Sequence, residues 1–170
     1  TITKLEDYCK RAKELGHTTI FTTNHGMQGD IFEATTLAEQ YDLKLIVGCE
    51  CYYVNDRFSK DKSNRHLIVI ALNDNGVKRL NKILTIANKE GFYYKPRIDH
   101  ELLMSLNSND FIITSACVAG ILNDENLVKE LSDKFKEHFF LEVQNHNQDI
   151  QKEWNKKALY FKDKYNIGLI

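Results

Sequence analysis

Residues 45–49, with the sequence Leu-Ile-Val-Gly-Cys, form a hydrophobic run that stops at the carboxylate of Glu50. Two more short hydrophobic runs stop in the same way, one at His25 and one at Cys117. Runs of this length and composition are typical of buried strands. In an α/β barrel the strand ends on one face converge, so ligands distant in sequence can meet around one metal cluster. The pattern therefore predicts strands that carry a metal site at their ends.

Strands and helices alternate along the whole chain, which predicts an α/β fold with mainly parallel strands. Strand patterns cover residues 18–23, 44–47, 66–72, 111–115 and 139–143, and residues 50–54 continue as an extended segment. Helical spacing of apolar residues covers residues 5–15, 30–40, 75–90, 99–106, 124–135 and 149–165. Residues 55–65 are polar and charged, which predicts a loop between two of the strands.

Capping signals set several of the predicted helix ends. Thr3 and Glu6 fit a capping box at the first helix, and Gly16 fits its C-terminus. Three aspartates are placed to cap later helices, and these are Asp30, Asp99 and Asp124.

The bulk composition limits the function classes. A chain of 170 residues predicts a single domain, here residues 1–170, and its 42% hydrophobic and 28% charged residues are ordinary for a globular protein. The net charge of −1 excludes a domain that is basic overall and clamps nucleic acid, although local patches remain compatible with it. The four cysteines include no C-x-x-C pair, which favours reduced thiols and a cytoplasmic location. No run is long enough for a membrane span, and no signal peptide is visible.

Each candidate ligand also has an ordinary structural interpretation. His25 precedes Gly26 and fits either a solvated loop residue or a ligand at a tight turn. Glu50 fits an exposed strand terminus or a metal-bound carboxylate. His66 opens a strand instead of ending one, which fits the barrel rule poorly. Small residues surround Cys117, and a buried structural cysteine is the competing interpretation there.

The segment around Pro96 has two interpretations. Arg97, Asp99 and His100 are close enough in sequence to form a local ion-pair cluster. The preceding Tyr-Tyr-Lys of residues 93–95 can either stack on bases or anchor a loop through its aromatic rings.

Two further polar residues follow later in the chain. Glu142 lies inside an apolar strand pattern and must face a lumen or be paired, and His146 is typical of a surface loop. No nucleotide-binding, nucleophile-elbow or H-E-x-x-H motif occurs. The residues alone therefore lead to a cytosolic α/β domain with a candidate His/Glu/Cys metal site, and the ordinary structural interpretation of each residue stays open.

Several segments together resemble the polymerase-and-histidinol-phosphatase (PHP) domain at the N-terminus of bacterial DNA polymerase III alpha subunits, which are replicative polymerases of the C family. The matching segments are residues 10–16 (Lys-Arg-Ala-Lys-Glu-Leu-Gly), 22–26 (Thr-Thr-Asn-His-Gly), 47–50 (Val-Gly-Cys-Glu), 66–69 (His-Leu-Ile-Val), 90–103, 115–120 (Ser-Ala-Cys-Val-Ala-Gly) and 140–146. The segments at 91–103 and 115–120 resemble the polymerase branch more than PHP phosphatases at large.

The resemblance implies a distorted (β/α)7 barrel with a cluster of up to three metal ions at the strand ends. On that pattern His25, Glu50, His66 and Cys117 are metal ligands. The implied ions are Zn²⁺, which suits His and Cys, or Mn²⁺ or Mg²⁺, which suit phosphodiester hydrolysis. No catalytic residue beyond these ligands is assigned.

Two departures from the family pattern bear on activity. The usual Thr-Asp-His-Gly has Asn24 in place of the acid, so His25 loses a negatively charged supporting residue. The family's H-x-H pair on the first strand and D-x-H at the last strand end are both missing, so we expect a domain that lacks the first strand and the end of the last. With the remaining ligands, one metal ion is the most that the chain can hold, and we expect the 170-residue chain alone to be inactive.

Three functions are compatible with this resemblance. The first is a metal-dependent 3′–5′ exonuclease or phosphoesterase site within a DNA-directed DNA polymerase, a nucleotidyltransferase of DNA replication. The second is a non-catalytic scaffold that stabilises the polymerase or docks a proofreading exonuclease. The third is a stand-alone PHP phosphoesterase. The implied partners are DNA, through the parent polymerase, and replisome subunits such as a sliding clamp and a proofreading exonuclease, with no membrane.

Overall fold

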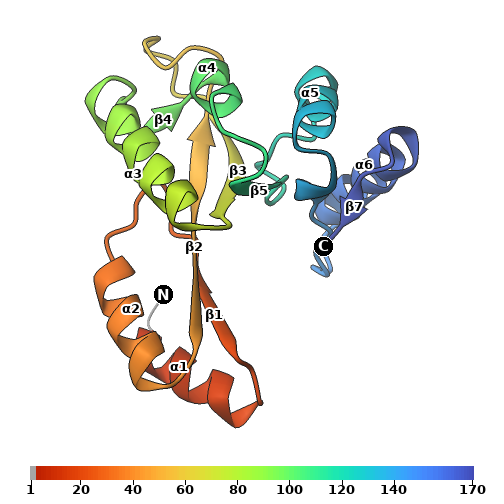
Figure 1. Ribbon diagram of the computed structural model, residues 1–170. Helices are drawn as coiled ribbons and strands as arrows, with labels where there is room; N and C mark the ends of the chain where they lie inside the picture. Colours follow the sequence, from red (N-terminus) through yellow and green to blue (C-terminus); the bar gives the residue numbers. More distant parts are fainter. Residues whose placement is uncertain (1–2) are drawn as a thin grey trace.

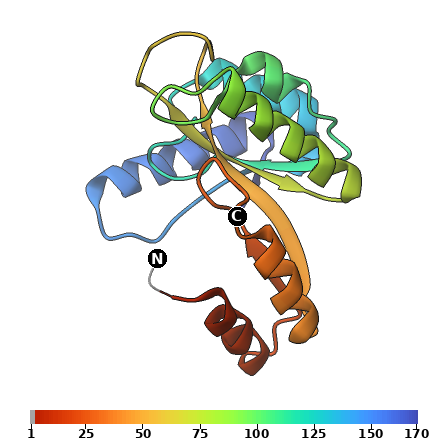
Figure 2. The ribbon, with the colours of Figure 1, turned by 90° about the vertical axis from the view of Figure 1, so that its left-hand side faces the viewer.

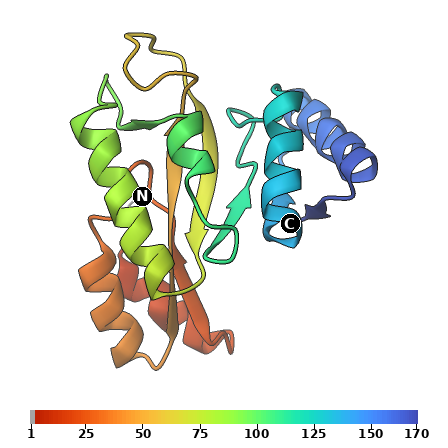
Figure 3. The same cartoon turned by 45° about the horizontal axis from the view of Figure 1, so that its top comes forward.

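One long strand organises the computed structural model, which describes residues 3–170 (Figure 1). This strand, β2 (Lys44–Tyr53), pairs through its first half with β1 (Thr19–Thr22) and through its second half with β3 (Arg65–Ala71) and β4 (Arg97–Ile98). The sheet continues through β5 (Phe111–Thr114), β6 (Phe139–Leu141) and β7 (Gly168–Leu169), in the order β1-β2-β3-β5-β6-β7 with β4 beside β2. The sheet curls into part of a barrel (Figure 3), so the predicted α/β class and barrel type are confirmed.

The helices pack beside strands that are near them in sequence. The α-helices in residues 3–170 are α1 (Leu5–Glu14), α2 (Ile31–Gln40), α3 (Asp74–Lys89), α4 (His100–Met104), α5 (Glu125–Phe135) and α6 (Asp149–Tyr165), and a 3₁₀ turn covers Lys136–His138. Contacts link α3 to β3 and β4, while α5 and α6 pack beside β5, β6 and β7. This arrangement follows from their amphipathic patterns, as in α3, where Leu80, Ile83 and Ala87 are buried.

Two apolar cores of unequal size stabilise the molecule. The larger core lies between the second half of β2, the strands β3, β5 and β6, and the helices α3 to α6. The smaller core joins α1, α2 and β1, and its buried members are Cys9, Ile20, Ala38 and Leu43. In Figures 1 and 2 this N-terminal lobe projects from the rest of the molecule, and β2 runs through both parts.

The prediction of mainly parallel strands needs one correction. β3 runs antiparallel to both of its neighbours, β2 and β5, while the other strand pairs are parallel. In addition, the predicted strand at 44–47 and the extended segment at 50–54 form one continuous strand up to Tyr53, so Glu50 lies inside a strand and not at the end of one. The strand predicted at 139–143 ends at Leu141.

The predicted caps have mixed outcomes. The side chains of Asp99 and Asp124 accept hydrogen bonds from the N–H groups of Leu102 and Leu127, as a cap requires. The capping box at Thr3 is wrong, because α1 begins at Leu5 with Lys4 as its N-cap and no side-chain cap hydrogen bond. Asp30 occupies the N-cap position of α2 without making the capping hydrogen bond.

Candidate metal centre

The β1–β2 pairing brings His25 next to Glu50. Beyond β1 the backbone stays in parallel register with β2, and an isolated bridge joins His25 to Glu50. The Gly26 N–H donates to the Glu50 carbonyl at 2.9 Å, and the Glu50 N–H donates to the Asn24 carbonyl at 3.0 Å. These backbone hydrogen bonds fix the turn that carries the His25 ring.

The reversed direction of β3 explains why His66 joins the site from the start of its strand. In the antiparallel β2–β3 pair, His66 lies opposite Tyr52, two residues beyond Glu50. Residues i and i+2 of a strand share a face, and directly paired residues do so too. Glu50, Tyr52 and His66 therefore lie on one face of the sheet. Because β3 is antiparallel, the start of its strand lies at the site, which explains why a histidine that opens a strand can join it.

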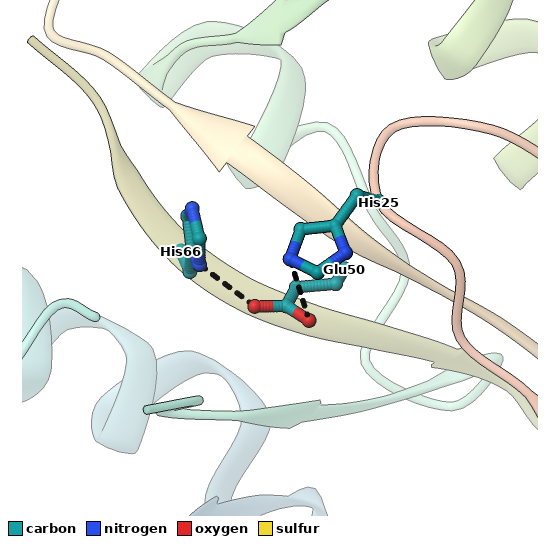
Figure 4. Close-up of side chains that lie close together, drawn as sticks. All are labelled: His25, Glu50 and His66. Atoms are coloured by element: carbon teal, nitrogen blue, oxygen red, sulfur yellow. Dashed lines mark ion pairs between the residues drawn. The ribbon is translucent and has the colours of Figure 1, made fainter. Parts of the chain in front are cut away.

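The three side chains converge as Figure 4 shows. Glu50 Oε1 lies 2.7 Å from His66 Nδ1, and Glu50 Oε2 lies 3.3 Å from His25 Nε2. One donor atom from each residue falls within a group whose members are all within 4.8 Å of one another. Two imidazoles and a carboxylate are a donor set that divalent transition metals prefer, so these residues fit a metal ion.

The burial of the three residues gives the centre an open side and a closed side. The side chains of Glu50 and His66 are 16% and 18% exposed, whereas that of His25 is 56% exposed. A carboxylate with so little access to water needs partners that are positively charged or donate hydrogen bonds. A ligand can approach from the His25 side, while the sheet closes the other side.

Cys117 lies at the edge of this group. Its Sγ is 3.7 Å from His66 Nδ1, and it is outside the set of three closely spaced donors. Ala116 has a φ of 56°, and a Cβ on Gly120 would lie 2.1 Å from the Ser115 carbonyl oxygen. Gly120 is therefore required by a tight turn, and this turn carries the Cys117 thiol toward His66.

Tyr52 and Cys49 support the site and were not among the candidates from the sequence. The Tyr52 ring packs against His25 and His66, with ring centroids 5.9 Å and 5.3 Å apart. Its position two residues after Glu50 on a strand was the available signal. On the other face of β2, the buried Cys49 thiol donates to the Asn24 carbonyl at 3.2 Å. Hydrogen bonds from the Cys51 thiol and from the N–H groups of the turn lower the pKa of Cys49 against the effect of burial.

The expected ion-pair cluster after Pro96 is wrong. Asp99 pairs with Arg57, whose Nη1 is 2.9 Å from Asp99 Oδ2, and His100 pairs with Glu130. Arg97 instead donates hydrogen bonds to backbone carbonyls. The buried Arg57 also contacts Glu101 and Glu90, and these hydrogen bonds raise its pKa above the ordinary arginine value.

Of the two later polar residues, Glu142 lies just beyond the end of β6 and His146 lies in the loop that follows. Glu142 is half-buried and paired, because its carboxylate accepts a hydrogen bond from the Thr114 hydroxyl and its N–H donates to the Ser115 hydroxyl at 2.9 Å. His146 is exposed. No helix within residues 3–170 is long and apolar enough to cross a membrane.

Comparison with known proteins relates this chain to one family and to one class of larger protein. The family model of the PHP domain matches residues 1–146. The DNA polymerase III subunit alpha of Aquifex aeolicus is 35% identical over 98% of this chain, and that of Chlamydia pneumoniae is 32% identical over 94%. The chain spans 16% and 14% of the length of these two relatives.

One solved structure carries the same relationship at the level of the fold. A protein from Bifidobacterium adolescentis, described as a metal-dependent phosphoesterase, superposes with a TM-score of 0.58. The match covers 98% of this chain and 80% of that chain at 15% identity, so it shows a shared fold.

Proposed function

The chain belongs to the PHP domain family, and we propose that its His25–Glu50–His66 group binds a divalent metal ion for the cleavage of phosphate esters. The observation that carries this proposal is the convergence within 4.8 Å of three donors, one beyond the end of β1, one inside β2 and one near the start of β3. We propose Cys117 as a fourth ligand, because its Sγ lies 3.7 Å from His66 Nδ1. When bound, a divalent ion supplies Lewis-acid activation of a phosphoryl group.

The residues of this chain have distinct roles in the proposed site. Glu50 holds both imidazoles in place through its two oxygens, which fixes the ring orientations before a ligand arrives. Tyr52 covers both rings on one side and excludes water there. The exposed His25 leaves the opposite side open to a phosphate group.

We further propose that residues 1–170 form one PHP domain within a larger DNA polymerase III alpha subunit. Both relatives described above are DNA polymerase III alpha subunits, and the chain matches only 16% and 14% of their length, which supports this proposal. In that parent protein the centre would serve a metal-dependent 3′–5′ exonuclease, in the cytoplasm and with DNA and replisome subunits as partners. A stand-alone phosphoesterase is less well supported, because these relatives are polymerase subunits.

A non-catalytic scaffold is the second candidate function, and Asn24 favours it. A carboxylate at that position would support His25, whereas the amide of Asn24 carries no charge and the residue is exposed. With His25, Glu50, His66 and Cys117 as its ligands, the chain can hold one ion at most. We therefore propose that the 170-residue chain alone does not hydrolyse DNA.

Metal binding can be tested by the thermal unfolding of the chain with Mn²⁺ or Zn²⁺. A ligand at about 100 times its Kd stabilises the folded state by about 2.7 kcal/mol, which raises the Tm by roughly 5–11 °C for a chain of this size. In Glu50→Gln a roughly 100-fold loss of affinity leaves about 0.4 kcal/mol, or a shift of about 1 °C. Glu130→Gln is the matched control, because it removes the other close Glu–His pair, at 2.6 Å, away from the site.

The outcomes separate the proposed functions. A metal-dependent Tm shift that Glu50→Gln abolishes and Glu130→Gln retains supports the metal centre. No shift in the wild-type protein with either ion contradicts it. Metal binding without release of nucleotides from labelled DNA by the full-length parent protein would favour the scaffold.

A further inference from the structure

A short segment after α3 packs directly onto the turn that carries His25. A Cβ built on Gly26 would lie 2.7 Å from Pro96 Cγ, so the Pro96 ring packs closely against the Gly26 backbone. Tyr94 has a φ of 58°, and the Tyr93 N–H donates to the Lys95 carbonyl at 3.1 Å. The tight turn at residues 93–95 therefore places Lys95 beside the metal centre.

Lys95 contacts the aromatic ring that supports both histidines. Its Nζ lies 5.1 Å from the centroid of the Tyr52 ring, which in turn packs against His25 and His66. Lys95 is exposed and forms no ion pair with any residue between positions 3 and 170. A free ammonium group therefore stands next to the proposed metal ligands, within reach of the same anionic ligand.

A second cation and exposed aromatic rings continue outward from Lys95. Lys62, on the loop between β2 and β3, places its Nζ 4.3 Å from the centroid of the Tyr94 ring. Tyr94 is 65% exposed and Phe92 is 60% exposed. Lys62 likewise has no ion pair within the described chain. Ammonium groups and aromatic faces side by side are the elements that bind the phosphates and bases of single strands.

Hydrogen bonds from Arg97 hold the polar loop that carries Lys62 in place. Arg97 donates to the carbonyl oxygens of Asp61 at 2.8 Å and Ser59 at 2.7 Å. Because Arg97 is part of the same segment as Lys95, one buried guanidinium fixes both cationic positions relative to each other. Such fixed positions reduce the ordering cost of binding.

We propose that Lys95, Lys62 and Tyr94 form a track for single-stranded nucleic acid that leads to the metal centre. Lys95 binds the backbone phosphate nearest the centre, Tyr94 stacks on a base, and Lys62 binds a phosphate farther along the strand. The assignment rests on the proposed function, because the strand end would be cleaved at that centre. It adds the residues that hold the strand and the strandedness of the substrate.

The test measures binding separately from catalysis. The fluorescence anisotropy of a labelled single-stranded oligonucleotide is recorded with the wild-type chain in EDTA, at several salt concentrations. Lys95→Met and Lys62→Met should each reduce the slope of log affinity against log salt by about 0.7, as expected for one lost phosphate contact. Tyr94→Ala should weaken binding about tenfold, whereas Tyr94→Phe keeps the stacking face and should bind like wild type.

Lys82→Met is the matched control, because Lys82 is an exposed lysine on α3 without an ion pair in the described chain. The melting temperature of every variant is measured, and Tyr94→Leu replaces Tyr94→Ala if that variant does not fold. The track is disproved if the wild-type chain shows no salt-dependent binding, if it prefers duplex, or if Lys95→Met behaves like Lys82→Met.

The results distinguish this proposal from the proposed function. Oligonucleotide binding that depends on Lys95 in EDTA, without any metal-dependent Tm shift, would support the track and contradict the metal centre. A metal-dependent shift with an unchanged salt slope in Lys95→Met would support the metal centre and contradict the track.

Discussion

Replacing Arg97 with methionine should destabilise the protein strongly. Arg97 is 2% exposed, and its guanidinium donates four hydrogen bonds to carbonyl oxygens, at 2.8 Å to Gly91, Asp61 and Arg57 and at 2.7 Å to Ser59. Three of these acceptors belong to the loop between β2 and β3. The side chain therefore joins that loop to the segment that precedes β4.

The magnitude follows from the number and kind of these hydrogen bonds. A hydrogen bond with a charged partner contributes about 1.5–3 kcal/mol, and a buried acceptor left without a donor costs a similar amount. The surface loop can move, so that water reaches part of the freed carbonyls, and methionine retains the aliphatic packing. We therefore expect Arg97→Met to lower the free energy of unfolding by about 3–5 kcal/mol, equivalent to roughly two of the four bonds.

Urea unfolding monitored by circular dichroism measures this loss. Arg79→Met is the control, because Arg79 makes one hydrogen bond at 2.7 Å to the Ser105 hydroxyl near the surface, and it should change stability by less than about 0.5 kcal/mol. A loss below about 1 kcal/mol for Arg97→Met, or one equal to that of the control, would refute the assignment of Arg97 as the anchor of the loop.

Three further predictions concern pH, the ligand turn and the fourth ligand. Burial raises the pKa of Tyr53 from 10.0 to about 12. Above pH 10 the phenol ionises in the unfolded protein but not in the folded one, so the contribution of neutral Tyr53 to the free energy of unfolding is full below pH 10 and is lost between pH 10 and 12. Between pH 10 and 12 the free energy of unfolding of Tyr53→Phe should therefore fall by about 2–3 kcal/mol less than that of the wild-type protein, as measured by unfolding curves at each pH. Gly26→Ala should cost about 2–3 kcal/mol in urea and weaken metal binding, because its φ is 66° and the new Cβ meets Pro96. Cys117→Ser should weaken Zn²⁺ binding in calorimetry by at least about tenfold and Mn²⁺ binding much less, since a thiolate prefers the softer ion; equal losses would exclude Cys117 as a ligand.

Local sequence signals located most elements of the fold. The last helix was predicted at 149–165, and α6 spans Asp149–Tyr165, because its apolar spacing and helix-forming residues agree. Asp99 and Asp124 were recognised as caps, since a side chain that bonds to a nearby N–H group depends on local geometry only. The prediction of Thr3 as a cap is wrong because α1 begins one residue later, after Lys4. Sequence patterns locate a helix end only to within one or two residues.

Strand direction and contacts between residues distant in sequence could not be predicted from local sequence patterns. An apolar run such as residues 66–72 has the same pattern whether it runs parallel or antiparallel to its neighbours. The direction of β3, and with it the position of His66 beside Glu50, depends on pairing across the chain. Similarly, nothing near Asp99 in sequence indicated Arg57 as its partner, because the two meet through the fold of the polar loop. Tyr52 was missed because its role depends on the two rings that pack against it.

The unequal cores imply that the proposed metal centre can open without unfolding of the whole protein. His25 is carried by the lobe whose buried apolar core consists of Cys9, Ile20, Ala38 and Leu43, whereas the β2–β3 pair that holds Glu50 and His66 belongs to the larger core. Regions with few buried contacts exchange their amide hydrogens through local opening at lower free energy. Amides of β1 should therefore exchange faster than those of β3, and a bound ion, by linking the two regions, should slow the exchange of β1 in particular.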